Sequence, residues 1–304
     1  MRSRRSVTVA TAAAVTSGAM AGVTGAAAYA AHRISGPRRP WPDYRFTPFE
    51  VGVPYEDVAF RAGDGPELAG WWLDRPGSST VVIGCHGHRG TRSDLLGIGP
   101  GLWRAGHTVV LFDCRGNGDS ADGLQSLAHH EREDLRAVID GVGRRRPDAE
   151  IVLLGFSMGA AVSIMVAAED QRVRALVLDS PFADMAGVIR HAMGRLRLPP
   201  FPLLGLTDLT TRIRYGYRFR DVEPVAVIGQ IAPRPLLLLH GQDDRVTPVS
   251  PTNWCCTRGR IIVAATSPTG PHTSTGSPAF WPEDRRRPSA AVGSSVGAAP
   301  LGAR

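Results

Sequence analysis

The stretch that most constrains the fold lies at residues 151–161, Ile-Val-Leu-Leu-Gly-Phe-Ser-Met-Gly-Ala-Ala. Four apolar residues precede a Gly-x-Ser-x-Gly motif, and small apolar residues that suit a helix follow it. This context predicts a strand, a sharp turn with Ser157 at its apex and then a helix. Gly155 and Gly159 would keep side chains out of the crowded turn. A chance match is the alternative in a chain with 35 glycines, but the apolar residues on both sides favour a nucleophilic serine.

Short apolar segments alternate with helical patterns along most of the chain. A Gly-Asp-Gly-Pro turn joins the first two of these segments into a hairpin. The alternation predicts an α/β fold with a mostly parallel, doubly wound sheet and helices on both faces. Strands are expected at 55–60, 68–73, 80–84, 107–112, 151–154, 173–178 and 235–239, and helices at 91–104 and 129–145.

The remaining segments set the domain boundaries. An α/β domain is expected at 51–272, interrupted at about 184–230 by an apolar, proline-broken segment. We interpret this segment as a helical cap over the site, with an ordinary long crossover as the alternative. Residues 32–50 are rich in proline and arginine and are expected to form a linker. Residues 273–304 lack a periodic apolar face, and their composition predicts a disordered or aberrant tail.

The N-terminal segment has the composition of a targeting sequence. Arg2, Arg4 and Arg5 precede the uncharged residues 7–31, which are rich in alanine, glycine, threonine and valine. This pattern predicts either a cleaved export signal or an N-terminal membrane anchor within residues 1–31. Both interpretations remain open, and both place the domain outside the cytoplasm, secreted or held at the membrane. A buried alanine-rich helix of the domain is disfavoured, because no polar face repeats at helical spacing.

The net charge of +7 does not indicate nucleic-acid binding. Residues 1–45 contribute +6 and residues 273–304 contribute +2, so residues 46–272 carry −1. A nearly neutral body offers no basic stripe for phosphate groups. We therefore expect no nucleic-acid partner.

A serine nucleophile needs a base and an acid that orients the base, and in this fold class these follow the serine in the order acid, then histidine. The segment His-Gly-Gln-Asp-Asp-Arg-Val-Thr-Pro at 240–248 carries two carboxylates at the end of an expected strand. Asp244 is the preferred acid, Asp243 is then structural, and Asp179 at the end of the preceding strand is the alternative. His272 is the only histidine after Asp244, so it is the predicted base, although it could instead belong to the tail.

An oxyanion hole requires two backbone N–H groups near the serine. The amide of Met158, directly after the serine, and the amide of His88, in the loop after the third expected strand, are the candidates. No metal site is expected from His86 and His88, because no further ligand pair follows at suitable spacing, and no cofactor is expected. Cys85 and Cys114 each end an expected strand, and two buried thiols are favoured over a disulfide.

Five ordered motifs together resemble the α/β-hydrolase family, and most closely its Bem46-like and prolyl-oligopeptidase-like esterases. They are His-Gly-His-Arg-Gly at 86–90, Phe-Asp-Cys-Arg-Gly-Asn-Gly-Asp-Ser at 112–120, Gly-Phe-Ser-Met-Gly at 155–159, Leu-Asp-Ser-Pro-Phe at 178–182 and the segment 240–248. In the family pattern the acid precedes x-Val-x-Pro, which selects Asp244, and the Asp113-x-Arg-Gly stretch is structural. The resemblance implies a serine hydrolase that cleaves a small-molecule ester or acyl substrate through an acyl-enzyme, with peptidase and acyltransferase activity still open.

The resemblance ends after residue 248. The family has a Gly-x-Gly-His turn and a last amphipathic helix, whereas this chain has Gly-Pro-His at 270–272 and then proline, arginine, serine and glycine. This change suggests a frameshifted or degraded C-terminus. The alternative function is therefore a catalytically impaired α/β-hydrolase-like binding protein, and His272 discriminates between the two hypotheses.

Overall fold

The computed structural model describes residues 2–36, 46–241, 244, 246–247 and 261–266. Its centre is a sheet of eight strands in the order β1-β2-β4-β3-β5-β6-β7-β8. The β1–β2 hairpin is antiparallel, β2 pairs antiparallel with β4, and all other neighbours are parallel. The strands are β1 (Glu56–Arg61), β2 (Glu67–Leu73), β3 (Thr80–Cys85), β4 (Thr108–Phe112), β5 (Glu150–Phe156), β6 (Val173–Asp179), β7 (Leu236–Gly241) and β8 (Ile261–Thr266).

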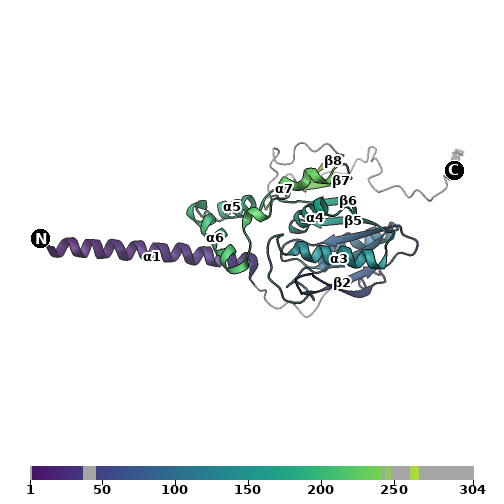
Figure 1. Ribbon diagram of the computed structural model, residues 1–304, viewed down its shortest axis with the longest axis horizontal. Helices are drawn as coiled ribbons and strands as arrows, with labels where there is room; N and C mark the ends of the chain where they lie inside the picture. The colour runs from purple at the N-terminus through teal and green to yellow at the C-terminus, as the bar shows by residue number, and fades with distance from the viewer. Residues whose placement is uncertain (1, 37–45, 242–243, 245, 248–260, 267–304) are drawn as a thin grey trace, which may run out of the picture.

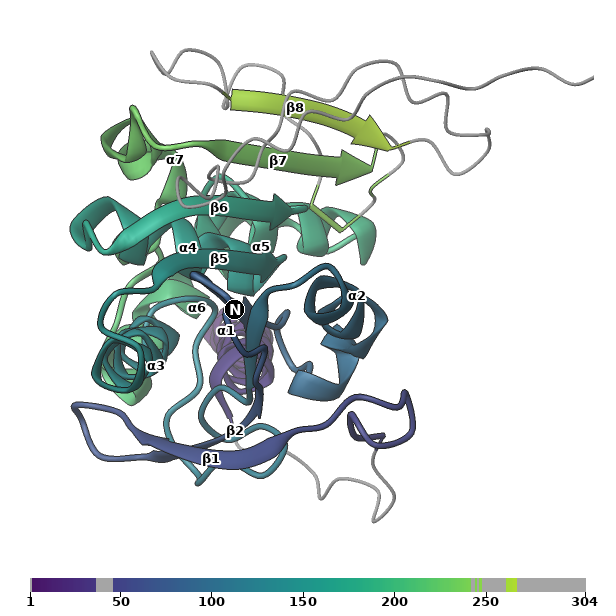
Figure 2. The same ribbon diagram turned by 90° about the vertical axis from the view of Figure 1, so that its right-hand side faces the viewer.

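Helices cover both faces of this sheet, which confirms the predicted fold class (Figure 2). α3 (Glu131–Arg145) and α4 (Met158–Glu169) bury their apolar side chains against one face. The 3₁₀ helix η1 (Arg92–Gly97) and α2 (Gly99–Arg104) cover the other. A single helix at 91–104 was therefore a wrong prediction. Gly97 and Gly99 weaken the helix, and Pro100 disfavours the helical conformation of the residue before it.

The segment between β6 and β7 is helical, and Figure 1 shows its first two helices standing to the left of the sheet, on the side from which the N-terminal helix extends. We call residues 185–231 the cap segment. It consists of α5 (Met185–Arg195), α6 (Pro200–Tyr215), η2 (Phe219–Asp221), α7 (Pro224–Val227) and η3 (Ile228–Ile231). α6 packs against α5 and against the N-terminal helix α1 (Arg2–Ser35).

α1 differs from the expectation for the N-terminus in two ways. It runs to Ser35, so the expected linker loses residues 32–35 to the helix. Its last turns also belong to the domain: Ala27 and Ala31 are buried in the core, and the Ser35 hydroxyl lies 2.7 Å from that of Tyr217. The C-terminal end of α1 is thus a buried part of the domain, although the sequence disfavoured this interpretation. Over the ranges that the structure describes, no helix is both long and apolar enough to cross a bilayer, so the expected transmembrane helix is not found.

Candidate active site

Ser157 occupies the turn between β5 and α4, where the sequence placed it. Its backbone has φ 49° and ψ −109°, a conformation that residues with a side chain rarely adopt. The Ser157 amide donates to the carbonyl of Asp179 at 2.8 Å, and the Ser157 carbonyl accepts from the Ala161 amide at 3.1 Å. The turn is therefore held by β6 on one side and by the first turn of α4 on the other.

The two glycines of the motif are required by close backbone approach. A Cβ at Gly155 would lie 2.6 Å from the Cα of Ala160. A Cβ at Gly159 would lie 2.1 Å from the carbonyl oxygen of Cys85. Both obstacles are backbone atoms, so a side chain at either position would displace α4 or the loop after β3. The glycines thus let α4 start directly beneath that loop.

The loop after β3 lies against the serine turn and carries one predicted oxyanion donor. A Cβ added at Gly87 would lie 3.7 Å from the Cβ of Ser157, so the loop passes beside the serine side chain. His88 follows in the same loop and is half-buried. Met158 is the first residue of α4, where backbone N–H groups lack acceptors within the helix. The structure thus brings the segments of both predicted donors to Ser157.

His86 positions this loop rather than offering a base. It is fully buried, and its Nε2 accepts from the Cys114 amide at 3.0 Å. Its Nδ1 donates to the Gly87 carbonyl at 2.7 Å. Both ring nitrogens are therefore engaged by backbone groups, so the imidazole links the loop after β3 to the loop after β4.

Asp244 lies after β7, with only β6 between β7 and the strand that leads to Ser157. Its carboxylate accepts from the amides of Val246 at 2.7 Å and Thr247 at 3.0 Å, and from the Thr247 hydroxyl at 2.6 Å. Partial burial alone would raise the pKa of Asp244, but the hydrogen bonds from Thr247 and Val246 hold it below its usual value. Asp244 is therefore a fixed, ionised carboxylate at neutral pH.

The sequence did not identify Thr247 and Ser180 as partners of the acid. Thr247 stands three residues after Asp244, and this Asp-x-x-Thr spacing is a signal for a local side-chain cap. Ser180 follows β6, and its proximity to Asp244 arises only from the pairing of β6 with β7. No local sequence pattern could have indicated that contact.

Asp179, the alternative acid, and His240 each hydrogen-bond to a backbone group close to the turn or to Asp244. The Asp179 side chain accepts from the Ser180 hydroxyl at 2.9 Å, and its carbonyl binds the Ser157 amide, so Asp179 supports the turn. His240 is buried, and its Nε2 donates to the Thr247 carbonyl at 2.6 Å. Asp243 and His272 lie outside the described residues, as does the tail at 273–304.

The Asp113-x-Arg-Gly stretch has the structural role that the resemblance implied. The Asp113 carboxylate accepts from the Arg92 amide at 2.7 Å and from the Asp119 amide at 3.0 Å. Arg115 is buried and forms ion pairs with Asp134 at 2.7 Å and Asp64 at 2.5 Å. These contacts tie the loop after β4 to α3 and to the β1–β2 turn.

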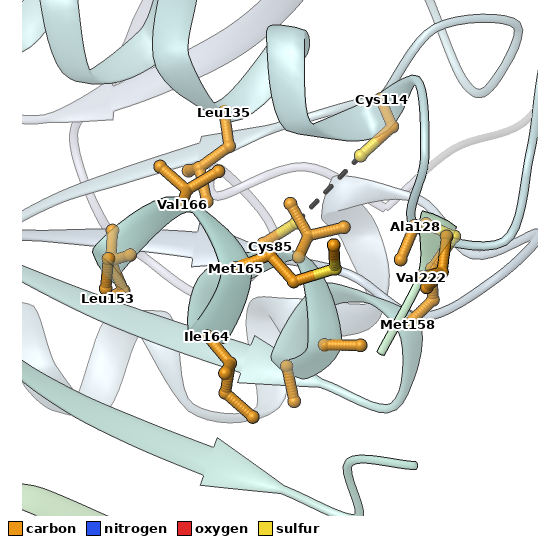
Figure 3. Close-up of a cluster of buried hydrophobic side chains, with 14 of the residues drawn as sticks. Cys85, Cys114, Ala128, Leu135, Leu153, Met158, Ile164, Met165, Val166 and Val222 are labelled. Carbon is orange, nitrogen blue, oxygen red and sulfur yellow. Dashed lines mark hydrogen bonds between the residues drawn. The ribbon is translucent and has the colours of Figure 1, made fainter. Parts of the chain in front are cut away.

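Cys85 and Cys114 are two free, buried thiols, as predicted (Figure 3). Their sulfur atoms lie 4.0 Å apart. The hydrogen bond with Cys85 and burial raise the pKa of the Cys114 thiol well above its usual value. This thiol is therefore neutral and unreactive in the folded protein. Among the residues that the structure describes, no group of three His, Cys, Asp or Glu side chains could hold a metal ion.

Comparison with known proteins gives concordant matches. Residues 77–231 match the family model for serine aminopeptidase S33 hydrolases. The uncharacterized protein YqkD of Bacillus subtilis is 29% identical over 210 residues, which are 67% of this chain and 68% of that protein. The lysophosphatidylserine lipase ABHD12 of Macaca fascicularis is 30% identical over 191 residues, 59% of this chain and 45% of that protein. The Pyrococcus furiosus esterase Pf2001 superposes with a TM-score of 0.61 at 24% identity, over 77% of this chain and 90% of its own, which shows a common fold.

Proposed function

The chain belongs to the α/β-hydrolase family, and we propose that it is a serine esterase that works through an acyl-enzyme at Ser157. The observation that carries the proposal is the backbone of Ser157, held at φ 49° between two glycines that no side chain could replace. Such strain persists at functional sites, because the surrounding structure must hold the residue there against its own preference.

In the proposed reaction the Ser157 Oγ attacks the carbonyl carbon of an ester while His272 takes the hydroxyl proton. The amides of Met158 and His88 donate to the oxyanion that forms. Collapse of this intermediate breaks the ester bond, and His272 returns the proton to the departing alcohol. Water then attacks the acyl-enzyme with His272 again as base and releases the acid. Asp244 orients His272 and stabilises its protonated form.

Two features support an ester substrate over a peptide. The acyl-enzyme chemistry is common to both, so the site itself does not discriminate between them. The relative named as a lysophosphatidylserine lipase and the neighbour named as an esterase both act on esters by name. The matched family description names aminopeptidases, and amide cleavage is therefore the second candidate.

A fluorophosphonate probe tests for a nucleophilic serine. We expect the wild-type protein to be labelled at Ser157 and the Ser157→Ala variant to lose labelling. Ser93→Ala is the matched control, because Ser93 lies in η1 and donates to the Phe46 carbonyl away from the turn. Absence of labelling in a folded wild-type sample would exclude the enzyme and leave the impaired binding protein.

Two further variants test the rest of the triad. Asp244→Asn and His272→Ala should each reduce the rate of labelling by about 10³-fold or more. His107→Ala is the histidine control, since His107 precedes β4 at the opposite end of the sheet from Ser157. Labelling that is insensitive to His272→Ala would exclude His272 as the base while leaving Ser157 in place.

Turnover then separates ester from amide cleavage. p-Nitrophenyl acyl esters of increasing chain length and aminoacyl p-nitroanilides should be compared at equal concentration. We expect higher kcat/KM for the esters, and Ser157→Ala should abolish it. Preferential hydrolysis of the anilides would instead assign the protein to the aminopeptidases.

A further inference from the structure

The connection between α5 and α6 exposes large apolar side chains beside arginines. We call residues 195–202 the cap tip; every one of them is exposed. Phe201 is 88% exposed, Leu196 71% and Leu198 42%. The backbone of the tip is ordered by hydrogen bonds from the Arg197 amide to the Gly194 carbonyl and from the Leu198 amide to the Met193 carbonyl. These apolar groups are thus held outward by a defined turn.

The outer side of α6 also exposes apolar side chains. Leu209 and Ile213 are 46% and 78% exposed, and their spacing of four residues places them on one face of the helix. The opposite face of α6 is buried in the domain through Leu203, Thr207, Thr211 and Tyr215. We call the cap tip and this outer side of α6 together the cap face. The buried face already anchors α6 in the domain, so the apolar side chains of the cap face are not needed for the packing of this helix.

The cap face concentrates exposed apolar groups to an unusual degree. Five of the twelve large apolar side chains that are exposed in the described residues fall within 196–213. Scattered single apolar residues are ordinary on a protein surface, whereas a cluster of this kind marks an interaction site.

The charge around the cap face is strongly positive. Residues 185–218 contain six arginines and one acid, Asp208, whose Oδ1 accepts from the Phe219 amide. Arg197, Arg212 and Arg214 are exposed among the apolar side chains. Arginines that surround exposed leucine and phenylalanine fit a partner with an apolar interior and an anionic surface. A second copy of the chain would instead bring like charges together.

We propose that the cap face docks onto an anionic lipid surface, with the apolar side chains inserted among the acyl chains and the arginines on the headgroups. The course of α1 supports this orientation. Figure 1 shows that α1 leaves the domain on the side that carries α5 and α6. One lipid surface could therefore contact both α1 and the cap face.

Flotation of the full chain with vesicles tests the proposal. The protein is mixed with vesicles of phosphatidylcholine alone or with added phosphatidylserine, and the partition coefficient is measured at low and high salt. We expect stronger binding with phosphatidylserine and weaker binding at high salt. Replacing Phe201 and Ile213 together by serine should lower binding to both vesicles by about tenfold or more. Replacing Arg197 and Arg212 together by glutamine should remove most of the preference for phosphatidylserine.

Matched controls come from the rest of the surface. Phe49 is 79% exposed outside the cap, and Arg174 is exposed on β6. The double variant Phe49→Ser with Arg174→Gln should bind vesicles as the wild type does. An equal loss in this control, or no loss in the cap variants, would overturn the proposal. Absence of vesicle binding together with dimers that the cap variants abolish would assign the face to a second copy instead.

Lipid docking and hydrolysis give separate readouts. Fluorophosphonate labelling without vesicles should be the same in the cap variants and the wild type, which also shows that the variants fold. A chain that binds vesicles but is never labelled would keep the docking surface and refute the proposed enzyme. A chain that is labelled but never binds vesicles would support the proposed enzyme and refute the docking surface.

Discussion

The backbone strain at the serine turn can be measured by comparing two substitutions of Ser157. Alanine and glycine at this position both remove the hydroxyl, so the two variants are equally incapable of forming an acyl-enzyme. They differ in backbone preference alone: alanine retains a Cβ at φ 49° and ψ −109°, whereas glycine adopts positive φ freely. We therefore predict that Ser157→Gly is more stable than Ser157→Ala.

The size of the difference follows from two opposing terms. A non-glycine residue in a sparsely populated backbone region costs about 1–3 kcal/mol. Glycine loses about 0.5–1 kcal/mol through the greater freedom of the unfolded chain. The net advantage of Ser157→Gly is thus about 0–2.5 kcal/mol in the free energy of unfolding, with a central value of about 1 kcal/mol. For a domain of this size each kcal/mol corresponds to about 2–4 °C in Tm.

Urea unfolding followed by circular dichroism measures this difference. Ala192, which is exposed in α5, provides the control: Ala192→Gly should destabilise by about 1 kcal/mol, because here the backbone is helical. The alanine-to-glycine exchange thus has opposite signs at the two positions. If Ser157→Gly were as unstable as Ser157→Ala, or less stable, the serine turn would not be strained and the main support for the active site would be lost.

Two further predictions concern the groups around Ser157. Gly159→Ala should destabilise the protein by about 3 kcal/mol and slow fluorophosphonate labelling, because its Cβ would meet the Cys85 carbonyl. The control is Gly205→Ala in α6, where the added Cβ has nothing within 4 Å. In the same urea titration this control should be neutral or stabilising. Thr247→Val should lower the free energy of unfolding by about 1 kcal/mol above about pH 5, where Asp244 is ionised and its lowered pKa favours the folded state. This loss of stability should shrink below about pH 4, as the carboxylate is protonated. A pH-independent cost, as expected for Thr210→Val, would contradict the link to Asp244.

Local patterns were sufficient for the serine turn and for the fold class. The Gly-x-Ser-x-Gly motif specifies its own geometry, because the clashes that exclude side chains at 155 and 159 arise within a few residues of the serine and from the adjoining loop. Alternating apolar segments likewise predicted the parallel sheet, since strands buried on both faces are apolar throughout.

Local sequence patterns could not predict the packing of α1 on the domain or the contact of Ser180 with Asp244. α1 lacks a repeated apolar face, yet Ala27 and Ala31 are buried in the core, and α1 packs against α6. The contact of Ser180 with the acid depends on β6 lying beside β7. Both are contacts between segments that are distant in the chain, and neither leaves a periodic signal in either segment.

The amino-acid sequence alone is enough to predict the α/β fold and the serine at the turn, because both leave patterns within a few residues, whereas Asp244 as the acid stays a prediction. Three arrangements could be seen only in the folded chain: the loop after β3 against Ser157, Ser180 beside Asp244, and the apolar groups gathered on the cap face. These arrangements depend on strand order and helix packing. Strand order and helix packing are settled by burial of the whole core rather than by any one segment.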